Sequence, residues 1–252
     1  MNDITIRRPI LWSSAAATDP GAVRAMNEDA IFSNPTIGLW AVADGMGGHE
    51  AGDVASNMIA ESLNQIGAQA QVDDFISTIE DSIKAVNHRL LEYAHSQHQG
   101  RIIGSTVAIL FIMEQTGVCL WAGDSRLYRL RNNELKQMTI DHSHVSELVR
   151  DGLISLEEAE SHPEANVITR AVGTYEHLQL DIEVFDARVG DSFLLCSDGL
   201  YNAVGHEKIL SCLLNERVTT ATDCLIEAAL HNNAADNVSV VLVKGSHSNI
   251  TD

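Results

Sequence analysis

Short apolar runs, each bounded by glycine, asparagine or aspartate, recur along the chain. Their lengths and flanking residues predict β-strands at 39–43, 105–112, 117–122, 126–130, 192–197 and 238–243, with a weaker one at 178–184. Elsewhere apolar residues repeat at helical spacing, which predicts amphipathic helices at 52–66, 75–93, 206–214 and 219–232. Because the helices are grouped between strands that mostly follow one another as hairpins, the pattern indicates an α+β layered fold.

The composition indicates one folding unit. The 252 residues are 45% hydrophobic, enough to fill a large core, and include no Pro-, Gly- or Ser-rich linker, repeat or low-complexity tract. We therefore expect a single domain over 1–252. Within it, the segment 131–172 is polar and rich in histidine and acidic residues, which makes it a candidate flap over a site. There Ser155 to Glu158 has the capping-box pattern, predicting a short helix that ends before Pro163.

The charge balance excludes some partners. The chain has 16 Lys and Arg against 35 Asp and Glu, a net charge of −19. A field of this sign repels nucleic acid and anionic membrane surfaces, so neither is an expected partner. No apolar run approaches membrane-spanning length. Nothing in the sequence requires a dimer, and we expect a monomer.

The four cysteines, Cys119, Cys196, Cys212 and Cys224, form no C-x-x-C pair and lie in apolar contexts. This usage predicts reduced core residues of a cytoplasmic protein. It suggests neither a disulfide framework nor a zinc site.

Four aspartates stand at the ends of apolar runs. Asp44, Asp124 and Asp198 each follow such a run, and Asp236 comes just before the last one. A strand that runs into Asp-Gly is by itself an ordinary turn signal. Four such aspartates together indicate one site instead. Carboxylates that approach within a few ångströms repel one another, so this site would need cations.

The ligand types favour a hard metal ion. Oxygen ligands without a nearby His/Cys cluster suit Mg²⁺ or Mn²⁺ better than Zn²⁺, and such ions usually serve phosphate chemistry. The Gly45 carbonyl, in the tight turn of VADGMGG, is a further candidate ligand. Upstream, Arg24 could fork onto two phosphate oxygens or form a surface salt bridge with Glu28. Glu28 and Asp29 could ligate or orient metal-bound water, or could simply be solvated.

Eight motifs then follow one another along the chain: RAMNEDA, VADGMGGHEAG, GSTVAI, AGDSRLYRL, TIDHSHV, NVITRAVG, LLCSDGLYNAV and ADNVSVVLV. This series resembles the bacterial branch of the PP2C (PPM) family of metal-dependent serine/threonine protein phosphatases. The resemblance extends from about residue 15 to 243 and depends on the order of the motifs. It implies a four-layer α-β-β-α sandwich, in which two antiparallel β-sheets are flanked by helices and a dinuclear metal centre lies in a cleft at one end.

The resemblance also implies roles for the acidic residues. Asp44 would bridge two metals, and the Gly45 carbonyl would bind one of them. Asp198 and Asp236 would complete the shell of the other metal. Asp124 falls on the acid that, with Asp198, holds a third and weaker metal. Two or three Mn²⁺ or Mg²⁺ ions per chain are therefore expected.

Three more residues match family positions on the upstream motif. Glu28 and Asp29 fall near the second metal, where they act through water. Arg24 falls on the phosphate-binding arginine. With Asp44 and Asp198, Arg24 is therefore expected to carry the catalysis.

The implied activity is hydrolysis of phosphoserine and phosphothreonine in proteins by a metal-activated water. No phosphoenzyme is expected, in agreement with the lack of a G-x-S-x-G elbow or an obvious thiolate site. Met46 stands where many eukaryotic members have a histidine proposed as general acid, although bacterial relatives commonly share this methionine. The general acid is left open among His49, His142, His144 and metal-bound water.

Two other functions stay open. A non-catalytic phosphoprotein-binding module would share the fold but typically lacks metal aspartates, whereas all the expected positions are acidic here. A hydrolase of small phosphate esters would share the site and differ in the flap. In the leading interpretation, the partners are phosphorylated proteins and a bacterial serine/threonine kinase that the chain opposes. The wording of RAMNEDA and GLWAVADGMGG also resembles stand-alone phosphatases of type VI secretion clusters.

Overall fold

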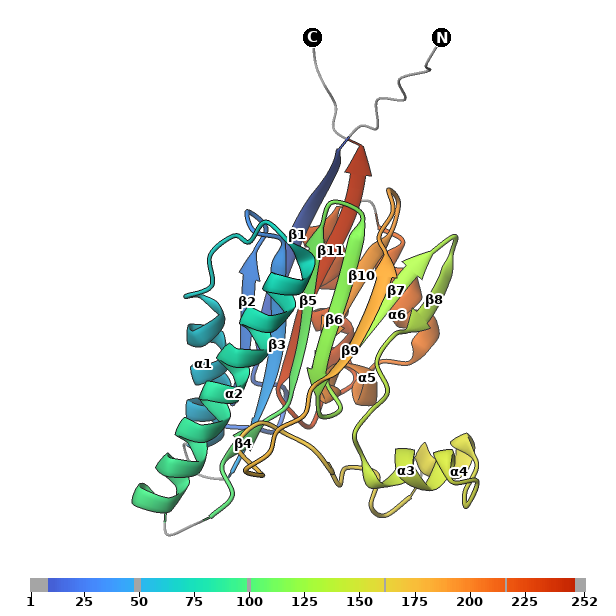
Figure 1. Cartoon of the computed structure of the whole chain (residues 1–252). Helices are drawn as coiled ribbons and strands as arrows, with labels where there is room; N and C mark the ends of the chain where they lie inside the picture. The colour runs from blue at the N-terminus through green and yellow to red at the C-terminus, as the bar shows by residue number, and fades with distance from the viewer. Residues whose placement is uncertain (1–8, 48–50, 99–100, 161, 216, 248–252) are drawn as a thin grey trace, which may run out of the picture.

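Two antiparallel β-sheets lie face to face at the centre of the molecule (Figure 1). The computed structural model describes residues 9–47, 51–98, 101–160, 162–215 and 217–247. Sheet A has the order β1-β11-β10-β7-β8 and consists of β1 (Ile10–Asp19), β11 (Val238–His247), β10 (Ser192–Cys196), β7 (Arg126–Arg131) and β8 (Glu134–Gln137). Sheet B has the order β2-β3-β5-β6-β9, with β4 beside β3, and consists of β2 (Asp29–Asn34), β3 (Leu39–Met46), β4 (Gly104–Ser105), β5 (Val107–Met113), β6 (Thr116–Ala122) and β9 (Asp181–Asp186).

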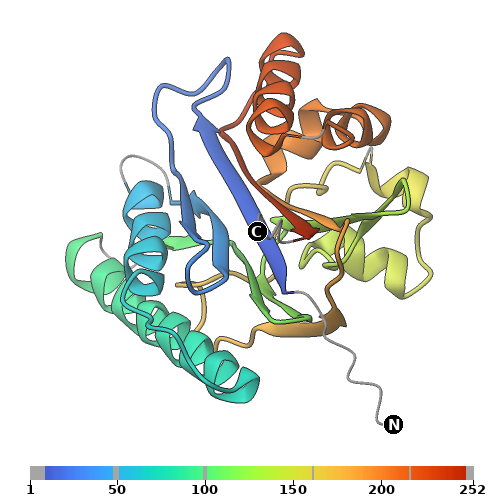
Figure 2. The ribbon, with the colours of Figure 1, turned by 90° about the horizontal axis from the view of Figure 1, so that it is seen from above.

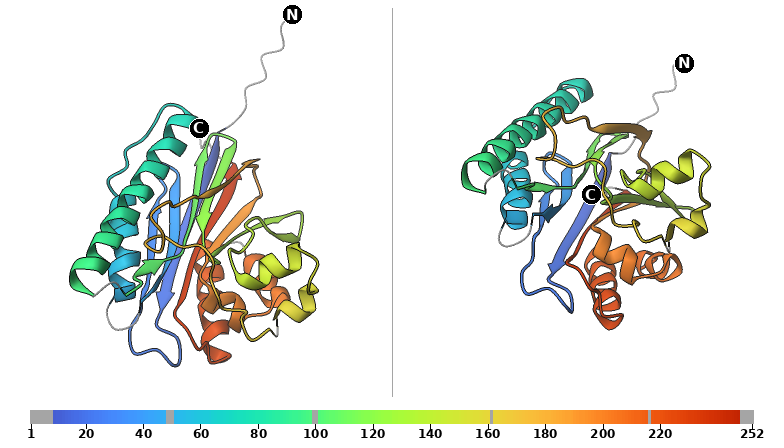
Figure 3. Two further views of the ribbon diagram at one scale, coloured as in Figure 1. Left: turned by 60° about the horizontal axis from the view of Figure 1, so that its bottom comes forward. Right: turned by 90° about the horizontal axis from the view of Figure 1, so that it is seen from below.

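Helices cover the outer face of each sheet, as the view down the strands shows (Figure 2). Sheet B is covered by α1 (Ala51–Leu63) and α2 (Val72–Gln97), and sheet A by α5 (Asp198–Ala203), α6 (His206–Leu213) and α7 (Val218–His231). The expected four-layer α-β-β-α sandwich of an α+β fold is therefore confirmed. Two short helices, α3 (His144–Arg150) and α4 (Leu156–Glu160), lie outside these layers (Figure 3). None of the described helices is long and apolar enough to cross a membrane.

Strand β3 is an example of a strand buried on both faces, which is why its sequence is a continuous apolar run. Leu39 and Ala41 pack into the core beneath α1 and α2, whereas Trp40 and Val42 pack between the two sheets. Successive side chains of a strand point to opposite faces, and here both faces are buried. The alternation of polar and apolar residues is therefore lost, as in any strand covered on both sides.

The structure contains every predicted strand and three that the sequence pattern did not reveal. The run 105–112 is divided between β4 and β5, and β1, β2 and β8 were missed. β1 and β8 are the edge strands of sheet A, and β2 is an edge strand of sheet B. The β1 sequence, ILWSSAAATD, is rich in small and polar residues because much of this strand is only partly buried. An edge strand needs less apolar surface, so its sequence signal is weak.

The segment 131–172 is divided in two. Its first residues form the end of β7 and strand β8, and the remainder contains α3 and α4. The capping box is present: the Ser155 N–H donates to Glu158 Oε2 at 2.8 Å and the Glu158 N–H donates to Ser155 Oγ at 3.2 Å. A bridge between Ser143 and Ile168 closes the base of this second part. We refer to residues 138–172 below as the flap.

Cys212 and Cys224 form a disulfide, so the prediction of four reduced cysteines is wrong for this pair. Packing of α6 against α7 brings their Cα atoms to 5.7 Å, inside the range that a disulfide spans. A separation of 12 positions in the sequence gives no sign of that packing. Cys119 and Cys196 are free and buried, as predicted. Burial raises the pKa of the Cys196 thiol to about 12.

Candidate active site

The four aspartates at the ends of the apolar runs lie at one end of the sandwich. Asp44 is near the end of β3 and Asp124 follows β6, while Asp198 follows β10 and Asp236 precedes β11. These ends of strands from both sheets meet at the lower end of the molecule in Figure 1, and Figure 3 turns this end toward the viewer. Asp44 is repelled by Asp29 as well as by the other three. Five carboxylates therefore share one region.

Asp29 and Asp124 are buried, and Asp44 and Asp198 are half-buried. Asp29 and Asp44 are directly opposite partners of the β2–β3 pair. Ser197 Oγ donates to Asp29 Oδ2 at 2.8 Å and accepts a hydrogen bond from the Ser239 N–H at 2.9 Å. Ser197 follows β10 and Ser239 lies in β11, both from sheet A, whereas Asp29 begins β2 of sheet B, so this hydroxyl connects the two sheets at the site.

Burial and mutual repulsion raise the pKa values of these carboxyl groups. Burial raises the pKa of Asp29 to about 6. Burial, with repulsion from Asp236, also raises the pKa of Asp198 to about 6. Burial, with repulsion from Asp198, raises the pKa of Asp124 to about 7. For Asp44, burial and then repulsion from Asp29 raise the pKa well above its ordinary value. A cation placed among them would oppose these effects.

Three buried carboxylate oxygens have no hydrogen-bond partner among the described residues: Asp29 Oδ1, Asp124 Oδ1 and Asp198 Oδ1. Buried polar atoms nearly always have a partner, so each unpartnered oxygen needs an explanation. The other oxygen of Asp198 accepts a hydrogen bond from Asn202 Nδ2 at 3.2 Å. Asp29 and Asp198 thus each have one oxygen held by the protein and one left over, an arrangement suited to ligating an ion.

The turn that carries Asp124 is held by an aromatic and cationic contact. The Tyr201 hydroxyl donates to the Asp124 carbonyl oxygen at 3.1 Å. The Arg126 guanidinium lies over the Tyr201 ring, 3.5 Å from its centroid. Arg126 Nη2 also donates to Asp141 Oδ2 at 2.6 Å, at the base of the flap. Helix α5 and the flap therefore both fix the position of Asp124.

Arg24 and Glu28 lie on the loop between β1 and β2, but they do not form the salt bridge considered from the sequence. Arg24 Nη2 instead donates to Asp236 Oδ2 at 2.7 Å. The Glu28 N–H donates to Asn237 Oδ1 at 2.8 Å. Arg24 thus lies at the exposed margin of the carboxylate group, and Glu28 is tied to the start of β11.

Two glycines, Gly45 of β3 and Gly52 of α1, allow these two elements to approach Glu28 and each other closely. A Cβ on Gly45 would lie 2.0 Å from the Gly52 carbonyl oxygen and 2.5 Å from the Glu28 carbonyl oxygen. A Cβ on Gly52 would lie 2.8 Å from Glu28 Oε1. Only glycine fits at such distances, so both residues let the backbone and a carboxylate come together.

The backbone of Asp44 is fixed by hydroxyl groups that the sequence reasoning did not single out. Thr106 Oγ1 accepts a hydrogen bond from the Asp44 N–H at 3.1 Å and bonds to Ser125 Oγ at 2.7 Å. Ser105 Oγ donates to the Asp44 carbonyl oxygen at 2.9 Å. These residues belong to the motifs GSTVAI and AGDSRLYRL, which were noted only for their order.

Most of the chain matches a known protein family. Residues 22–233 match the family model described as protein phosphatase 2C. The chain belongs to the protein phosphatase 2C family. It is 39% identical over 229 residues to the serine/threonine protein phosphatase PstP of Mycobacterium tuberculosis. That match covers 90% of this chain but 44% of PstP, so the chain spans less than half of that relative's length.

Solved structures of PP2C proteins have the same fold. One is PppA, described as a key regulatory component of T6SS in Pseudomonas aeruginosa. Its sequence is 37% identical to this chain, and the two structures superpose with a TM-score of 0.87 over 95% of this chain and 100% of PppA. Another is the catalytic domain of PstP in complex with two manganese ions. It is 33% identical to this chain, with a TM-score of 0.84 over 94% of this chain and 99% of the PstP domain. The family resemblance identified from the sequence is confirmed, and the enzyme class predicted from it is that of PstP.

Both ring nitrogens of His142, one candidate general acid of this PP2C chain, are directed at groups other than the five carboxylates of the site. Its ring stacks on Trp121, with ring centroids 6.0 Å apart. Nδ1 accepts a hydrogen bond from the Gly123 N–H at 3.1 Å, and Nε2 lies 3.3 Å from Asp181 Oδ2. Burial lowers the pKa of His142. These contacts make it a link between the flap and the turn after β6.

The other histidines do not resolve the general acid. His144 Nε2 lies 3.3 Å from Glu164 Oε2, within the flap. His49 lies outside the described residues. Met46, whose thioether cannot donate a proton, is the last residue of β3. The general acid therefore stays open.

The carboxylate group fits divalent metals in its chemistry. Its ligands are oxygens, three of which are buried and unpartnered, and hard ions such as Mn²⁺ and Mg²⁺ bind such ligands. Among the described residues, however, no group of three or more His, Cys, Asp or Glu side chains is already arranged so that it could hold an ion. The residue types and the burial of these carboxylates thus match a metal centre, but their side chains are not already arranged around a position for an ion.

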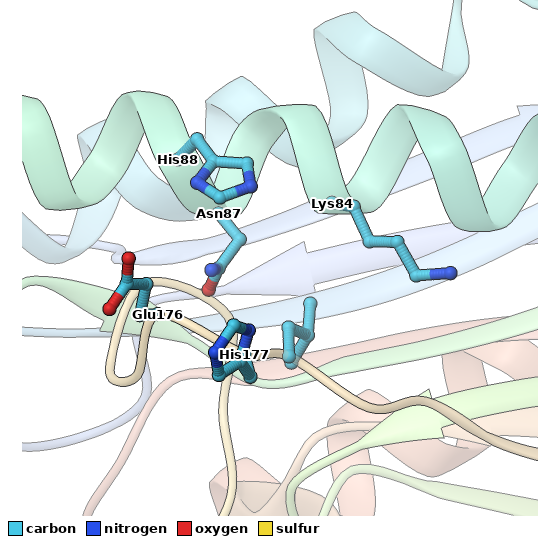
Figure 4. Close-up of a pocket in the computed structure, with 6 residues that line it drawn as sticks. Lys84, Asn87, His88, Glu176 and His177 are labelled. Carbon is cyan, nitrogen blue, oxygen red and sulfur yellow. The ribbon is translucent and has the colours of Figure 1, made fainter.

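A separate pocket lies away from these carboxylates. It has a volume of about 240 Å³ and is lined by Lys84, Asn87 and His88 of α2 and by Glu176, His177 and Leu178 (Figure 4). Asn87 is buried and connects α2 to the loop at residues 173–175: its Nδ2 donates to the Tyr175 carbonyl oxygen at 2.9 Å, and its Oδ1 accepts from the Gly173 N–H at 2.7 Å. The pocket contains none of the residues expected to act on phosphate.

Proposed function

We propose that this chain is a metal-dependent protein phosphatase that hydrolyses phosphoserine and phosphothreonine esters in proteins. The observation that supports this most is the group of buried carboxylates with three unpartnered oxygens beside an arginine at its margin. The manganese-bound PstP domain, which shares the fold, supports the same class of metal for this chain.

In this proposal, two or three Mn²⁺ or Mg²⁺ ions are held by oxygens of seven residues: Glu28, Asp29, Asp44, Gly45, Asp124, Asp198 and Asp236. Such ions, when bound, supply positive charge for phosphate oxygens and lower the pKa of water. They would also relieve the repulsion that raises the pKa values of Asp29, Asp124 and Asp198. The protein itself contributes position and charge, since hydrogen bonds from Ser105 and Thr106 hold Asp44 and one from Ser197 holds Asp29.

Arg24 would bind the phosphoryl group. A guanidinium presents parallel N–H donors that match two phosphate oxygens. The Arg24 side chain is 51% exposed, so it can reach a substrate, and its contact with Asp236 keeps it over the carboxylate group. Thr106 and Ser105 hold the Asp44 backbone, so that its carboxylate needs little reorganisation during the reaction.

The test is manganese-dependent release of phosphate from a phosphothreonine peptide. Asp44→Asn and Asp198→Asn keep the shape of each side chain and remove its charge, and both should abolish turnover. Asp223→Asn is the matched control, because Asp223 is an exposed aspartate on α7, on the outer side of sheet A. An intact wild-type chain that releases no phosphate at saturating manganese would refute the proposal and favour a phosphoprotein-binding module.

The same assay separates the remaining alternatives. Faster turnover of nucleotides than of phosphothreonine peptides would favour a hydrolase of small esters. The expected partners are phosphorylated proteins and a bacterial serine/threonine kinase. PppA and PstP are similarly close in structure, so membership of a type VI secretion pathway stays a prediction. A monomeric state and a cytoplasmic location also stay predictions. The cytoplasmic location was predicted partly from four reduced cysteines, and two of them form a disulfide.

A further inference from the structure

The loop at residues 20–28 presents two large apolar side chains to solvent. Val23 is 70% exposed and Met26 is 45% exposed, and they stand on either side of Arg24 in the sequence. Side chains so exposed add little to the stability of the fold. Single exposed apolar residues are common on protein surfaces, so exposure alone assigns them no role. Their position beside the proposed phosphate-binding arginine is what sets them apart.

The loop is held firmly even though its tip is exposed. The Gly21 N–H donates to Asp19 Oδ1 at 2.8 Å, and the Ala22 N–H donates to the Ala234 carbonyl oxygen at 2.8 Å. Gly21 has φ +78°, and a Cβ there would lie 2.2 Å from the Asp236 carbonyl oxygen. Any side chain would disrupt this contact, so the loop lies directly against the residue that pairs with Arg24.

The other margin of the site also exposes apolar residues. Ile102 is exposed, and a Cβ on Gly47 would lie 3.3 Å from the Ile102 carbonyl oxygen, close to the turn after β3. Ile140 is exposed as well, and its carbonyl oxygen accepts a hydrogen bond from Trp121 Nε1 at 2.9 Å. Both therefore lie on loops at the carboxylate end of the sandwich.

We propose that Val23 and Met26 determine substrate specificity by contacting aliphatic side chains that flank the phosphorylated residue. The inference rests on the proposed function and names its substrate class: extended phosphopeptides with a large aliphatic residue within two positions of the phosphothreonine or phosphoserine.

The reach of the loop fits this substrate. Val23 is adjacent to Arg24 and Met26 is two residues beyond it, so their Cα atoms lie within about 4 and about 7 Å of that of Arg24. An extended peptide advances about 3.3 Å per residue, and two residues therefore span about 7 Å. A peptide whose phosphate is bound by Arg24 therefore has its flanking residues within a span comparable to that of the short loop that exposes Val23 and Met26. Apolar contact there removes exposed surface from both molecules.

The experiment compares phosphothreonine peptides that carry leucine or serine at each of the two positions on either side of the phosphothreonine. The wild-type chain should have a kcat/KM roughly 3- to 10-fold higher for the best leucine peptide than for its serine counterpart. The double variant Val23→Thr, Met26→Gln keeps side-chain size and should remove this preference. Free O-phosphothreonine, which has no flanking residues, should be hydrolysed equally by both proteins.

Val189→Thr is the matched control, because Val189 is 36% exposed on the connection between β9 and β10, at the opposite end of the strands. It should keep the preference for leucine. Equal kcat/KM for leucine and serine peptides in the wild type, or a preference that survives in the double variant, would overturn the inference while leaving the phosphatase activity standing. A wild type inactive on every substrate would overturn the proposed function as well.

Discussion

Asn237 accepts a hydrogen bond from the Glu28 N–H through Oδ1 at 2.8 Å, although the two residues are 209 positions apart. Its Nδ2 donates to the carbonyl oxygens of Pro20 and Met26, each at 2.9 Å. One buried carboxamide thus satisfies three backbone groups of the loop that carries Arg24. Because β11 begins at the next residue, this side chain ties the loop to sheet A.

Asn237→Ala should therefore weaken phosphate binding by releasing the loop. We expect a KM for a phosphothreonine peptide on the order of 10-fold higher, and inhibition by inorganic phosphate weakened to a similar extent. The free energy of unfolding should fall by about 1–3 kcal/mol, because three backbone groups of the loop lose their hydrogen-bond partner. Steady-state kinetics and denaturant unfolding measure these effects.

A double-mutant cycle decides whether Asn237 acts through Arg24. If it does, Asn237→Ala should change KM little in an Arg24→Ala background. Asn232→Ala is the matched control, since Asn232 also donates to a backbone carbonyl, that of Ala203 at 2.8 Å, but on the α5–α7 side. Fully additive effects of the Asn237 and Arg24 substitutions would count against a positioning role.

Thr106→Val should reduce turnover while leaving the chain folded. The substitution keeps the side-chain shape but removes the oxygen that accepts a hydrogen bond from the Asp44 N–H. A small displacement of a reacting group can lower rates on the order of 10- to 100-fold, and we expect a loss of kcat in that range.

Thr222→Val controls for the loss of a buried hydroxyl. Thr222 is buried on α7, where its hydroxyl donates to the Val218 carbonyl oxygen at 2.8 Å, away from the carboxylates. The control should keep its activity. Equal activity of the Thr106 variant and wild type would show that this hydroxyl does not matter for Asp44.

The metal-free chain should become less stable as the pH rises from about 4 to about 7. The pKa of Asp29 rises from 3.8 to about 6 and that of Asp124 from 3.8 to about 7, so the folded chain binds more protons than the unfolded chain in this window. The contribution of these groups to stability is therefore complete at acidic pH and is lost as pH rises through the folded-state pKa values. Thermal unfolding in chelator across this range measures the effect.

Manganese and a charge-removing variant check the cause of this pH dependence. Ions that bind only the folded chain should raise its Tm, most clearly near neutral pH, where the carboxylates are ionised. Asp198→Asn should flatten the pH dependence in chelator, because one buried titrating group is removed. A metal-free Tm that rises steadily between pH 5 and 7 would contradict the assignment of raised pKa values to the folded state.

The disulfide between Cys212 and Cys224 should stabilise the sheet A side of the molecule. The loop that it closes spans 12 positions, for which the loss of chain entropy in the unfolded state predicts about 3 kcal/mol. Cys212→Ser with Cys224→Ser, or reduction of the wild type, should lower the free energy of unfolding by that order. Thiol counting on denatured, unreduced protein should detect two thiols, and four would show that the bond is absent.

Local patterns in the sequence were sufficient for much of the fold. β3 and β10 are buried on both faces, so their apolar runs were unmistakable, and the Ser155–Glu158 capping box was predicted because its partners are three residues apart. β1 was missed because an edge strand of small and polar residues carries little hydrophobic signal. α5 was missed because six residues are too few to show a helical period.

The sequence by itself determined which chemistry is present: carboxylates at the ends of apolar runs, an arginine upstream of them, and motifs in the order of the PP2C family. Only the tertiary structure decided the pairings, namely Arg24 with Asp236 rather than Glu28, Asn237 with Glu28, and Cys212 with Cys224. The physical reason is distance along the chain. A strand, a cap or a turn depends on neighbours a few residues away, whereas these contacts depend on how two sheets and their helices pack.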